Sequence, residues 1–168
     1  MPPRRSRSGP GRAYFPVLRR RSWPPKLPGV IDQFEGAVEF PAGTRTAVDA
    51  AAAIGCDVSQ IVKSLVFRDG EDGPPVLVLC AGANTVDVQR LGLVKADADF
   101  VRAVTGYPIG GVPPWGWATA PARTVIDRDL LVHAEIWAAA GTPRSVFPLS
   151  PSDLLARTDG EVGVVAAG

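Results

Sequence analysis

The stretch Thr105–Trp117, TGYPIGGVPPWGW, decides how the rest of the chain is interpreted. It combines four glycines with three prolines, and proline lacks the N–H that a helix or an inner strand needs. Its other residues are mainly apolar or aromatic, which a solvated linker does not require. This composition predicts a shaped loop that presents backbone N–H groups to a ligand, with a structural turn packed on the core as the alternative.

Length and composition indicate one globular domain, since the 168-residue chain is 46% hydrophobic and 21% charged. No apolar run approaches the length of a membrane span, so we expect no membrane partner. Two cysteines, Cys56 and Cys80, lack CxxC spacing, and His133 is the single histidine. This inventory argues against a metal site or a disulfide scaffold and fits a reducing cytoplasm. Both cysteines stand in apolar surroundings, where a buried inert thiol is commoner than a nucleophile.

Charge divides the chain into two parts. Residues 1–26 hold eight basic and no acidic side chains, whereas the remainder holds ten basic and seventeen acidic ones, a net charge of −7. We expect residues 1–28 to form a disordered Pro/Arg-rich extension, 29–160 the folded domain, and 161–168 a tail without an assigned element. The acidic domain does not favour RNA in bulk, so RNA would contact a local patch or the basic extension.

Residues 60–68, QIVKSLVFR, have the composition of a strand. Period-two alternation places Lys63 on the same face as Ile61, Leu65 and Phe67. A lysine among three large apolar side chains in mid-strand predicts the lining of a pocket. The alternative is a lysine whose ammonium reaches solvent along the strand.

The remaining pattern predicts further short strands and scattered short helices. A helix opens at Thr46, which can cap it with Asp49 at the third helical position, and ends at Gly55. Other helices are expected at 86–94, 97–106 and 150–158, a hairpin turn at 69–75, and strands at 36–41, 75–82, 122–131, 132–141 and 145–149. The predicted fold class is therefore α+β, a curved mixed sheet or partial barrel surrounded by short helices.

The motif inventory lacks the usual nucleophiles, general bases and cofactor fingerprints. No P-loop, no GxGxxG after a strand, no GxSxG elbow and no convincing carboxylate pair occurs. What remains is Lys63, the 105–117 loop, the turn at 141–143 and the polar cap near Thr46. This set suits the binding and orientation of a substrate that brings its own reactive group, and it implies no cofactor.

Four segments, TAVDAAAAIG, QIVKSLVF, TGYPIGGVPPWG and WAAAGTPRSVFPLSPSDLL, resemble in this order the YbaK/prolyl-tRNA synthetase-associated editing domain family. The resemblance runs from about Val38 to Thr158. It implies a mixed α/β fold around a curved sheet. It also implies a freestanding trans-editing enzyme that hydrolyses mischarged aminoacyl-tRNA, such as cysteinyl- or alanyl-tRNA(Pro), with the aminoacyl-tRNA 3′ end and prolyl-tRNA synthetase as partners.

The resemblance also implies roles for individual residues. The functional lysine of the family falls on Lys63, which would meet the phosphate or ribose end of the terminal adenosine. Loop N–H groups would hold the aminoacyl carbonyl, and the terminal ribose hydroxyl, or a substrate thiol, would help to cleave the ester. The expected substrate-binding residues are Thr46, Gly106, Tyr107, Gly110, Gly111, Val112, Pro113, Gly116, Gly141 and Thr142.

Two departures from the family pattern stand out. Gly116 is followed by Trp117 where many relatives have histidine, which bears on substrate choice. Residues 1–28 do not supply the amphipathic helix that usually precedes the first strand. Two other functions remain open: a non-catalytic module that binds a tRNA end or a nucleotide, and an interaction domain recruited to a synthetase through the Arg-rich extension.

Overall fold

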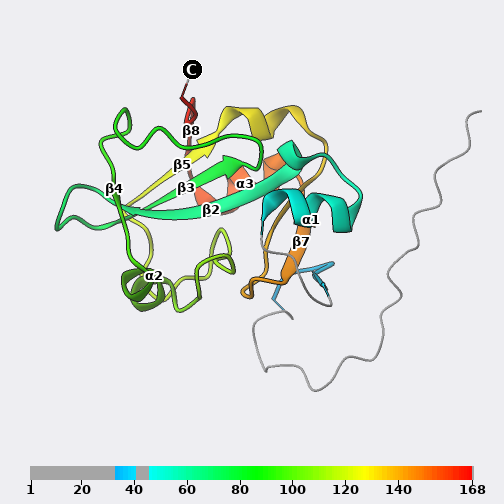
Figure 1. The fold of residues 1–168 in the computed structure, drawn as a ribbon, viewed down its shortest axis with the longest axis horizontal. Helices are drawn as coiled ribbons and strands as arrows, with labels where there is room; N and C mark the ends of the chain where they lie inside the picture. Colours follow the sequence, from blue (N-terminus) through cyan, green and yellow to red (C-terminus); the bar gives the residue numbers. More distant parts are fainter. Residues whose placement is uncertain (1–32, 41–45, 168) are drawn as a thin grey trace, which may run out of the picture.

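The computed structural model describes residues 33–40 and 46–167, and within these ranges an eight-stranded mixed sheet carries three α-helices (Figure 1). The strand order is β1-β7-β6-β2-β3-β5-β8, and β4 pairs with β2 outside this path. This architecture confirms the expected mixed α/β class. The predicted Arg-rich extension, residues 1–28, lies outside the described residues.

The elements are short except for the central hairpin of β2 and β3. The strands are β1 (Val38–Glu39), β2 (Ile61–Arg68), β3 (Pro75–Ala81), β4 (Val94–Lys95), β5 (Arg123–Asp127), β6 (Ile136–Ala139), β7 (Ser145–Leu149) and β8 (Glu161–Gly163). The helices are α1 (Ala47–Ile54), α2 (Ala98–Thr105) and α3 (Pro151–Thr158), with two 3₁₀ helices, η1 (Val58–Gln60) and η2 (Arg128–Val132). The β2–β3 hairpin confirms the turn expected at residues 69–75.

Capping residues fix the ends of α1 as the sequence predicts. The Thr46 side chain accepts a hydrogen bond from the N–H of Asp49, and the Asp49 carboxylate accepts one from the N–H of Thr46. Gly55 ends the helix in the left-handed conformation, with φ of 82°. Each of these contacts satisfies a backbone group that the helix end leaves unpaired, so α1 is confined to Ala47–Ile54.

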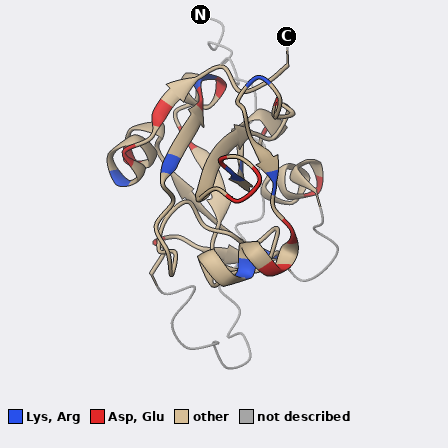
Figure 2. Cartoon of the chain, turned by 90° about the vertical axis from the view of Figure 1, so that its left-hand side faces the viewer, with Lys and Arg blue, Asp and Glu red and all other residues tan. Residues whose placement is uncertain are grey.

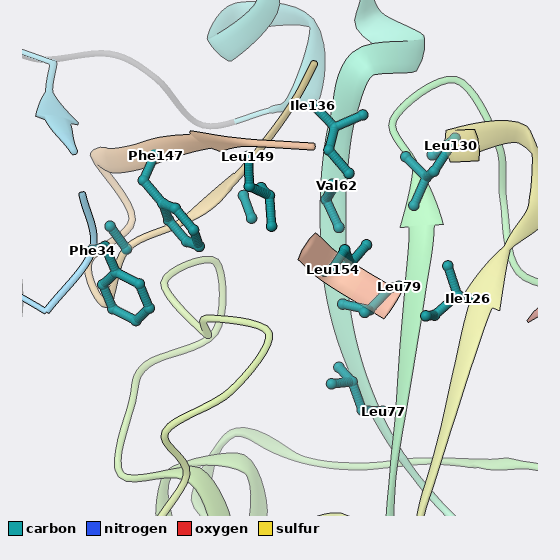
Figure 3. Packing of buried hydrophobic residues seen from close by; sticks show 13 residues of the cluster. Phe34, Val62, Leu77, Leu79, Ile126, Leu130, Ile136, Phe147, Leu149 and Leu154 are labelled. Atoms are coloured by element: carbon teal, nitrogen blue, oxygen red, sulfur yellow. The ribbon is translucent and has the colours of Figure 1, made fainter. Parts of the chain in front are cut away.

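The main core lies on one face of the sheet, under α3 and η2. Alternation along β2 and β3 directs Val62, Leu77 and Leu79 to this face, where Leu130 of η2 and Leu154 of α3 cover them (Figure 3). Phe34, Trp115 and Phe147 extend the same cluster, and the rings of Phe34 and Phe147 stack at 4.5 Å. Strand β3 is buried along its whole length, as its uninterrupted apolar sequence predicts.

Residues 86–94 do not form the predicted helix. Val86 instead makes a β-bridge with Ala166, a turn follows, and Val94 opens β4. Gly92 has φ of +65°, which interrupts a right-handed helix, and Leu93 is buried against the second face of the sheet. The apolar residues of this segment therefore pack as an extended turn, and their helix-like spacing is misleading.

Two predicted strands are shorter than expected. Strand β5 ends at Asp127, because the buried Asp127 carboxylate caps the 3₁₀ helix η2 through the N–H of Asp129 at 3.1 Å. The strand predicted over 132–141 is reduced to β6, which covers only Ile136–Ala139. A local side-chain cap thus overrides the strand propensity of the apolar residues that follow Asp127.

Residues after Gly160 are part of the sheet, although the sequence assigns them no element. Strand β8 pairs in parallel with β5, and Val165 is 0% exposed against the second face of the sheet. The three residues of β8, Glu-Val-Gly, are too few to show a periodicity that would predict this strand. Its position depends on pairing with β5, a long-range contact that only the fold supplies.

Acidic and basic residues are both distributed along the chain (Figure 2). The described residues include sixteen acidic and nine basic side chains, and the basic ones lie scattered along the ribbon. No helix in the described ranges has the length and hydrophobicity to cross a membrane. Any anionic ligand must therefore be recognised at a local feature of the surface.

The buried position of Val165 yields a direct test of how the segment after β8 packs. We expect Val165→Ala to lower the free energy of unfolding by about 2 kcal/mol, because it removes buried methyl groups and leaves a cavity. Val164, its neighbour, is 41% exposed, and Val164→Ala should change stability by less than about 0.5 kcal/mol. Urea unfolding of both variants measures the difference, and equal effects would contradict the packing of this segment.

Candidate functional site

Strand β2 has an interrupted outer edge. Strand β3 occupies one edge of β2 over residues 62–68, so β6 and β4 must both pair with the other edge. Strand β6 pairs with Ile61 and Val62, and β4 pairs with Phe67 and Arg68. Residues 63–66 therefore have no partner on this edge among the described strands. Every second residue of this stretch directs its N–H and C=O groups into the gap.

A pocket of about 850 Å³ opens at this gap. Its floor is β2 from Ile61 to Phe67. Residues from both faces of β2 line the pocket, because the cavity extends around the unpaired edge of this strand. Phe40, α1 and Trp137 border one end, whereas Lys95 and Val101 border the other. Figure 1 shows the same arrangement, with α1 near the start of β2 and with β4 and α2 near its far end.

Lys63 is oriented by a chain of hydrogen bonds behind the pocket. Its Nζ donates to the backbone carbonyl of Asn84. The Asn84 side-chain amide donates to Oδ2 of Asp127 and to Oδ2 of Asp129, both at 2.8 Å. Asp127, 1% exposed, also accepts from the N–H of Ala81 at 3.0 Å. A buried carboxylate thus fixes the turn that holds the lysine, while the lysine itself lines the pocket.

Cys80 lies directly across the β2–β3 ladder from Lys63 and is fully buried. Burial raises the pKa of the Cys80 thiol to about 12; the positive charge of Lys63 opposes this shift, and the carboxylate of Asp127 adds to it. The thiol is therefore protonated at neutral pH. Cys80 is also absent from the lining of the pocket, so it cannot serve there as a nucleophile.

The 105–117 loop is braced by its own polar groups. The buried Thr105 hydroxyl donates to the carbonyl of Val101 at 2.6 Å and accepts from the N–H of Tyr107 at 3.0 Å. The Trp117 indole N–H donates to the carbonyl of Pro113 at 2.8 Å. The Tyr107 hydroxyl donates to the Gly116 carbonyl at 3.4 Å. These contacts support the prediction of a shaped loop, and the burial of residues 111–114 supports the alternative, a turn packed on the core, as well.

Gly111 joins this loop to the turn after β6. A Cβ atom at Gly111 would lie 2.8 Å from the backbone of Thr142, so only glycine allows the two segments to approach this closely. Thr142 is fixed in turn by Ser145, whose hydroxyl lies 2.8 Å from the Thr142 hydroxyl and 3.1 Å from its N–H. The loop and the turn therefore form one rigid wall of the pocket.

The structure brings some of the predicted site residues into the pocket and places others behind it. Those that line the pocket are Lys63, Thr46, Gly110 and Val112. Those outside its lining are Gly106, Tyr107, Gly111, Pro113, Gly116, Gly141 and Thr142. Several of the second group shape the wall: Gly106 ends α2, and Pro113 accepts the bond from Trp117. The Thr46 hydroxyl already accepts the capping bond of α1.

Most lining residues were not predicted from the sequence, among them Ser64, Trp137 and Lys95. Ser64 follows Lys63, and its buried Oγ has no hydrogen-bond partner in the described part of the chain. Trp137 and Lys95 come from β6 and β4, which meet β2 only through sheet pairing. The position of Ser64 beside a pocket lysine is a signal that could have found it. Lys95 stands between two segments that are predicted to be helices, 86–94 and 97–106, so no local pattern marks it.

The high pKa of Cys80 leads to a labelling test. At pH 7.5 a thiol with a pKa of about 12 is ionised in fewer than roughly one molecule in 10,000, so we expect N-ethylmaleimide to leave Cys80 of the folded protein unmodified. The Cys56→Ser variant isolates this thiol, and the same protein in urea should label fully. Rapid labelling of folded Cys56→Ser protein would contradict the buried, protonated state.

Sequence comparison relates the chain to proteins of tRNA charging. Residues 41–156 match the aminoacyl-tRNA editing domain. The uncharacterized protein YwhH of Bacillus subtilis is 34% identical over 122 residues, which cover 69% of this chain and 76% of YwhH. A proline--tRNA ligase of Thiobacillus denitrificans is 30% identical over 114 residues, which cover 64% of this chain but only 19% of the ligase.

Comparison with solved structures also relates the chain to a protein described as an editing enzyme. A crystal structure described as a candidate trans-editing enzyme for prolyl tRNA synthetase superposes with a TM-score of 0.72 and 46% identity. The match covers 79% of this chain and 86% of that protein. Sequence and fold agree over the segment that contains β2, the 105–117 loop and the turn after β6. The chain belongs to the aminoacyl-tRNA editing domain family.

Proposed function

We propose that the protein is an aminoacyl-tRNA deacylase that acts in trans on mischarged tRNA. The observation that carries this proposal is a pocket with one fixed lysine and an open strand edge, in whose described lining no nucleophile is paired with a base. Such a site can bind a substrate and orient it. The chemistry of ester cleavage then depends on a group that the substrate supplies.

Among the residues that the structure describes, the pocket lining contains no cysteine, histidine, aspartate or glutamate. Its hydroxyl groups, those of Thr46, Ser64 and Ser145, therefore have no imidazole or carboxylate in the pocket to activate them. In the proposed reaction the free hydroxyl of the terminal ribose orients a water molecule, which adds to the acyl carbon. The ester C–O bond breaks, a proton from the water passes to the ribose oxygen, and the free amino acid leaves. With a cysteinyl substrate, its own thiol sulfur adds to the acyl carbon instead, the same C–O bond breaks, the thiol proton passes to the ribose oxygen, and a cyclic thioester leaves.

Lys63 and the 105–117 loop supply the binding groups. The Lys63 ammonium contacts the phosphate or ribose of the terminal adenosine, and the Asn84 carbonyl holds it in place. Backbone N–H groups near Gly110 hold the aminoacyl carbonyl, where negative charge develops during the reaction. The unpartnered Ser64 hydroxyl and the open edge at residues 63–66 offer further hydrogen bonds within the same pocket.

Small residues set the size of the amino acid that enters. Ala47, Ala50 and Ala139 line the pocket near Trp137. A synthetase pocket built for proline discriminates poorly against smaller amino acids, because one methylene is worth only about 1–3 kcal/mol. A second pocket limited in size removes such errors, so we propose alanine or cysteine on the proline tRNA as substrates. The likeness to a proline--tRNA ligase and to a candidate trans-editing enzyme for prolyl tRNA synthetase supports this choice and suggests that synthetase as a partner in the cytoplasm.

Deacylation of labelled alanyl-, cysteinyl-, seryl- and prolyl-tRNA(Pro) tests the proposal. We expect selective release of one non-cognate amino acid, with prolyl-tRNA left intact. Lys63→Ala should lower kcat/KM by about 100-fold, because the terminal adenosine loses its fixed cation. Lys63→Arg keeps the charge but changes its geometry, and should retain part of the activity.

Two results would overturn the assignment. Undiminished hydrolysis by Lys63→Ala, in a variant whose thermal unfolding is unchanged, would place the reaction elsewhere. Saturable binding of tRNA without release of any amino acid would instead indicate a non-catalytic binding module.

A further inference from the structure

The pocket has a local charge opposite to that of the domain around it. The described residues carry sixteen acidic and nine basic side chains, yet the pocket is lined by two lysines, Lys63 and Lys95, and by no carboxylate. A cleft lined by one sign of charge between apolar walls concentrates ligands of the other sign. This distribution favours an anion over a neutral or cationic ligand.

The two lysines stand at different positions along the floor of the pocket. The pocket follows β2 from Ile61 to Phe67, and Lys95 pairs across the β2–β4 ladder with Phe67. Phe67 is four positions after Lys63, which corresponds to roughly 13 Å along an extended strand. This separation allows the second cation to contact a different group of the ligand from the one that Lys63 contacts. The second cation reaches a part of the ligand farther from the acyl site.

Lys95 is available for a ligand. It is exposed, and within residues 33–40 and 46–167 its side chain makes no hydrogen bond or ion pair, although its backbone lies in the ladder with Phe67. The nearby carboxylate of Asp97 accepts a hydrogen bond from the N–H of Phe100 at 2.8 Å, as the cap of α2. Arg68, which shares the β2–β4 ladder, lies over the Phe100 ring at 3.9 Å and donates to the Glu71 carbonyl. Among these neighbours the Lys95 ammonium is the cation without an internal partner.

We propose that Lys95 binds a backbone phosphate of the nucleotides that precede the terminal adenosine of the tRNA 3′ end. This inference rests on the proposed function, in which Lys63 contacts that adenosine. A lysine pairs with phosphate as a flexible point charge, which requires no fixed geometry. Lys95 therefore contributes affinity for single-stranded RNA to a domain of net negative charge, while the chemical step stays at the Lys63 end of the pocket.

The test compares Lys95→Gln with Arg102→Gln, which removes the same charge from an exposed position of α2 outside the pocket lining. In deacylation assays we expect Lys95→Gln to raise KM about 5- to 10-fold at low salt and to change kcat less than twofold. Arg102→Gln should change neither by more than about twofold. A fall in kcat without a rise in KM, or equal effects of the two variants, would overturn the role of Lys95.

Binding of a short fluorescent RNA that ends in CCA separates this inference from the proposed function. The slope of log affinity against log salt should become shallower by about 0.7 in Lys95→Gln, the value for one phosphate contact on a single strand. It should be unchanged in Arg102→Gln. If the wild type binds this RNA but cleaves no aminoacyl ester, only the deacylase proposal fails. If the slope and affinity are the same in wild type and Lys95→Gln, or if the wild type does not bind, the Lys95 proposal fails.

Discussion

The incomplete pairing of β2 is the constraint on which the rest of the structure depends. A strand in mid-sheet normally satisfies both of its edges, but β6 and β4 each cover only one end of this one. The stretch between them would expose backbone groups and invite pairing with another chain. Here the 105–117 loop, α1 and the turn after β6 enclose this stretch. An unpaired edge that would otherwise favour aggregation therefore forms the floor of a pocket.

The hairpin of β2 and β3 also carries the polar system behind the pocket. Lys63 and Cys80 face each other across the ladder, and the turn after β3 returns the Asn84 carbonyl to the lysine. Asp127, at the end of the neighbouring strand β5, holds that turn by accepting hydrogen bonds from Ala81 and Asn84. A buried carboxylate is costly unless its hydrogen bonds are satisfied, and Asp127 has three donors. These hydrogen bonds offset the energetic cost of burying Asp127, and they also fix the turn whose carbonyl orients Lys63.

Much of the fold could be predicted from local sequence, because capping and alternation are local effects. Thr46, Asp49 and Gly55 define α1, and the alternation in 60–68 places Lys63 beside Ile61 on β2. Prediction from the sequence failed where contacts between distant segments determine the secondary structure. The segment 86–94 has helical spacing but becomes a turn against the sheet, and β8 depends on β5. The same limit applies to the site: Lys95 reaches the pocket only through the pairing of β4 with β2, while the roles of Lys63 and the loop stay predictions.

The close approach of Gly111 to Thr142 has a mechanical consequence. Two segments that touch through bare backbone cannot slide past each other by rotamer changes, since there is no side chain between them to rearrange. Where the loop and the turn meet, the width of the pocket therefore changes only when the backbone of one of them moves. Evolution could alter the width of such a pocket by substitutions on the opposite wall, with Gly111 itself left unchanged.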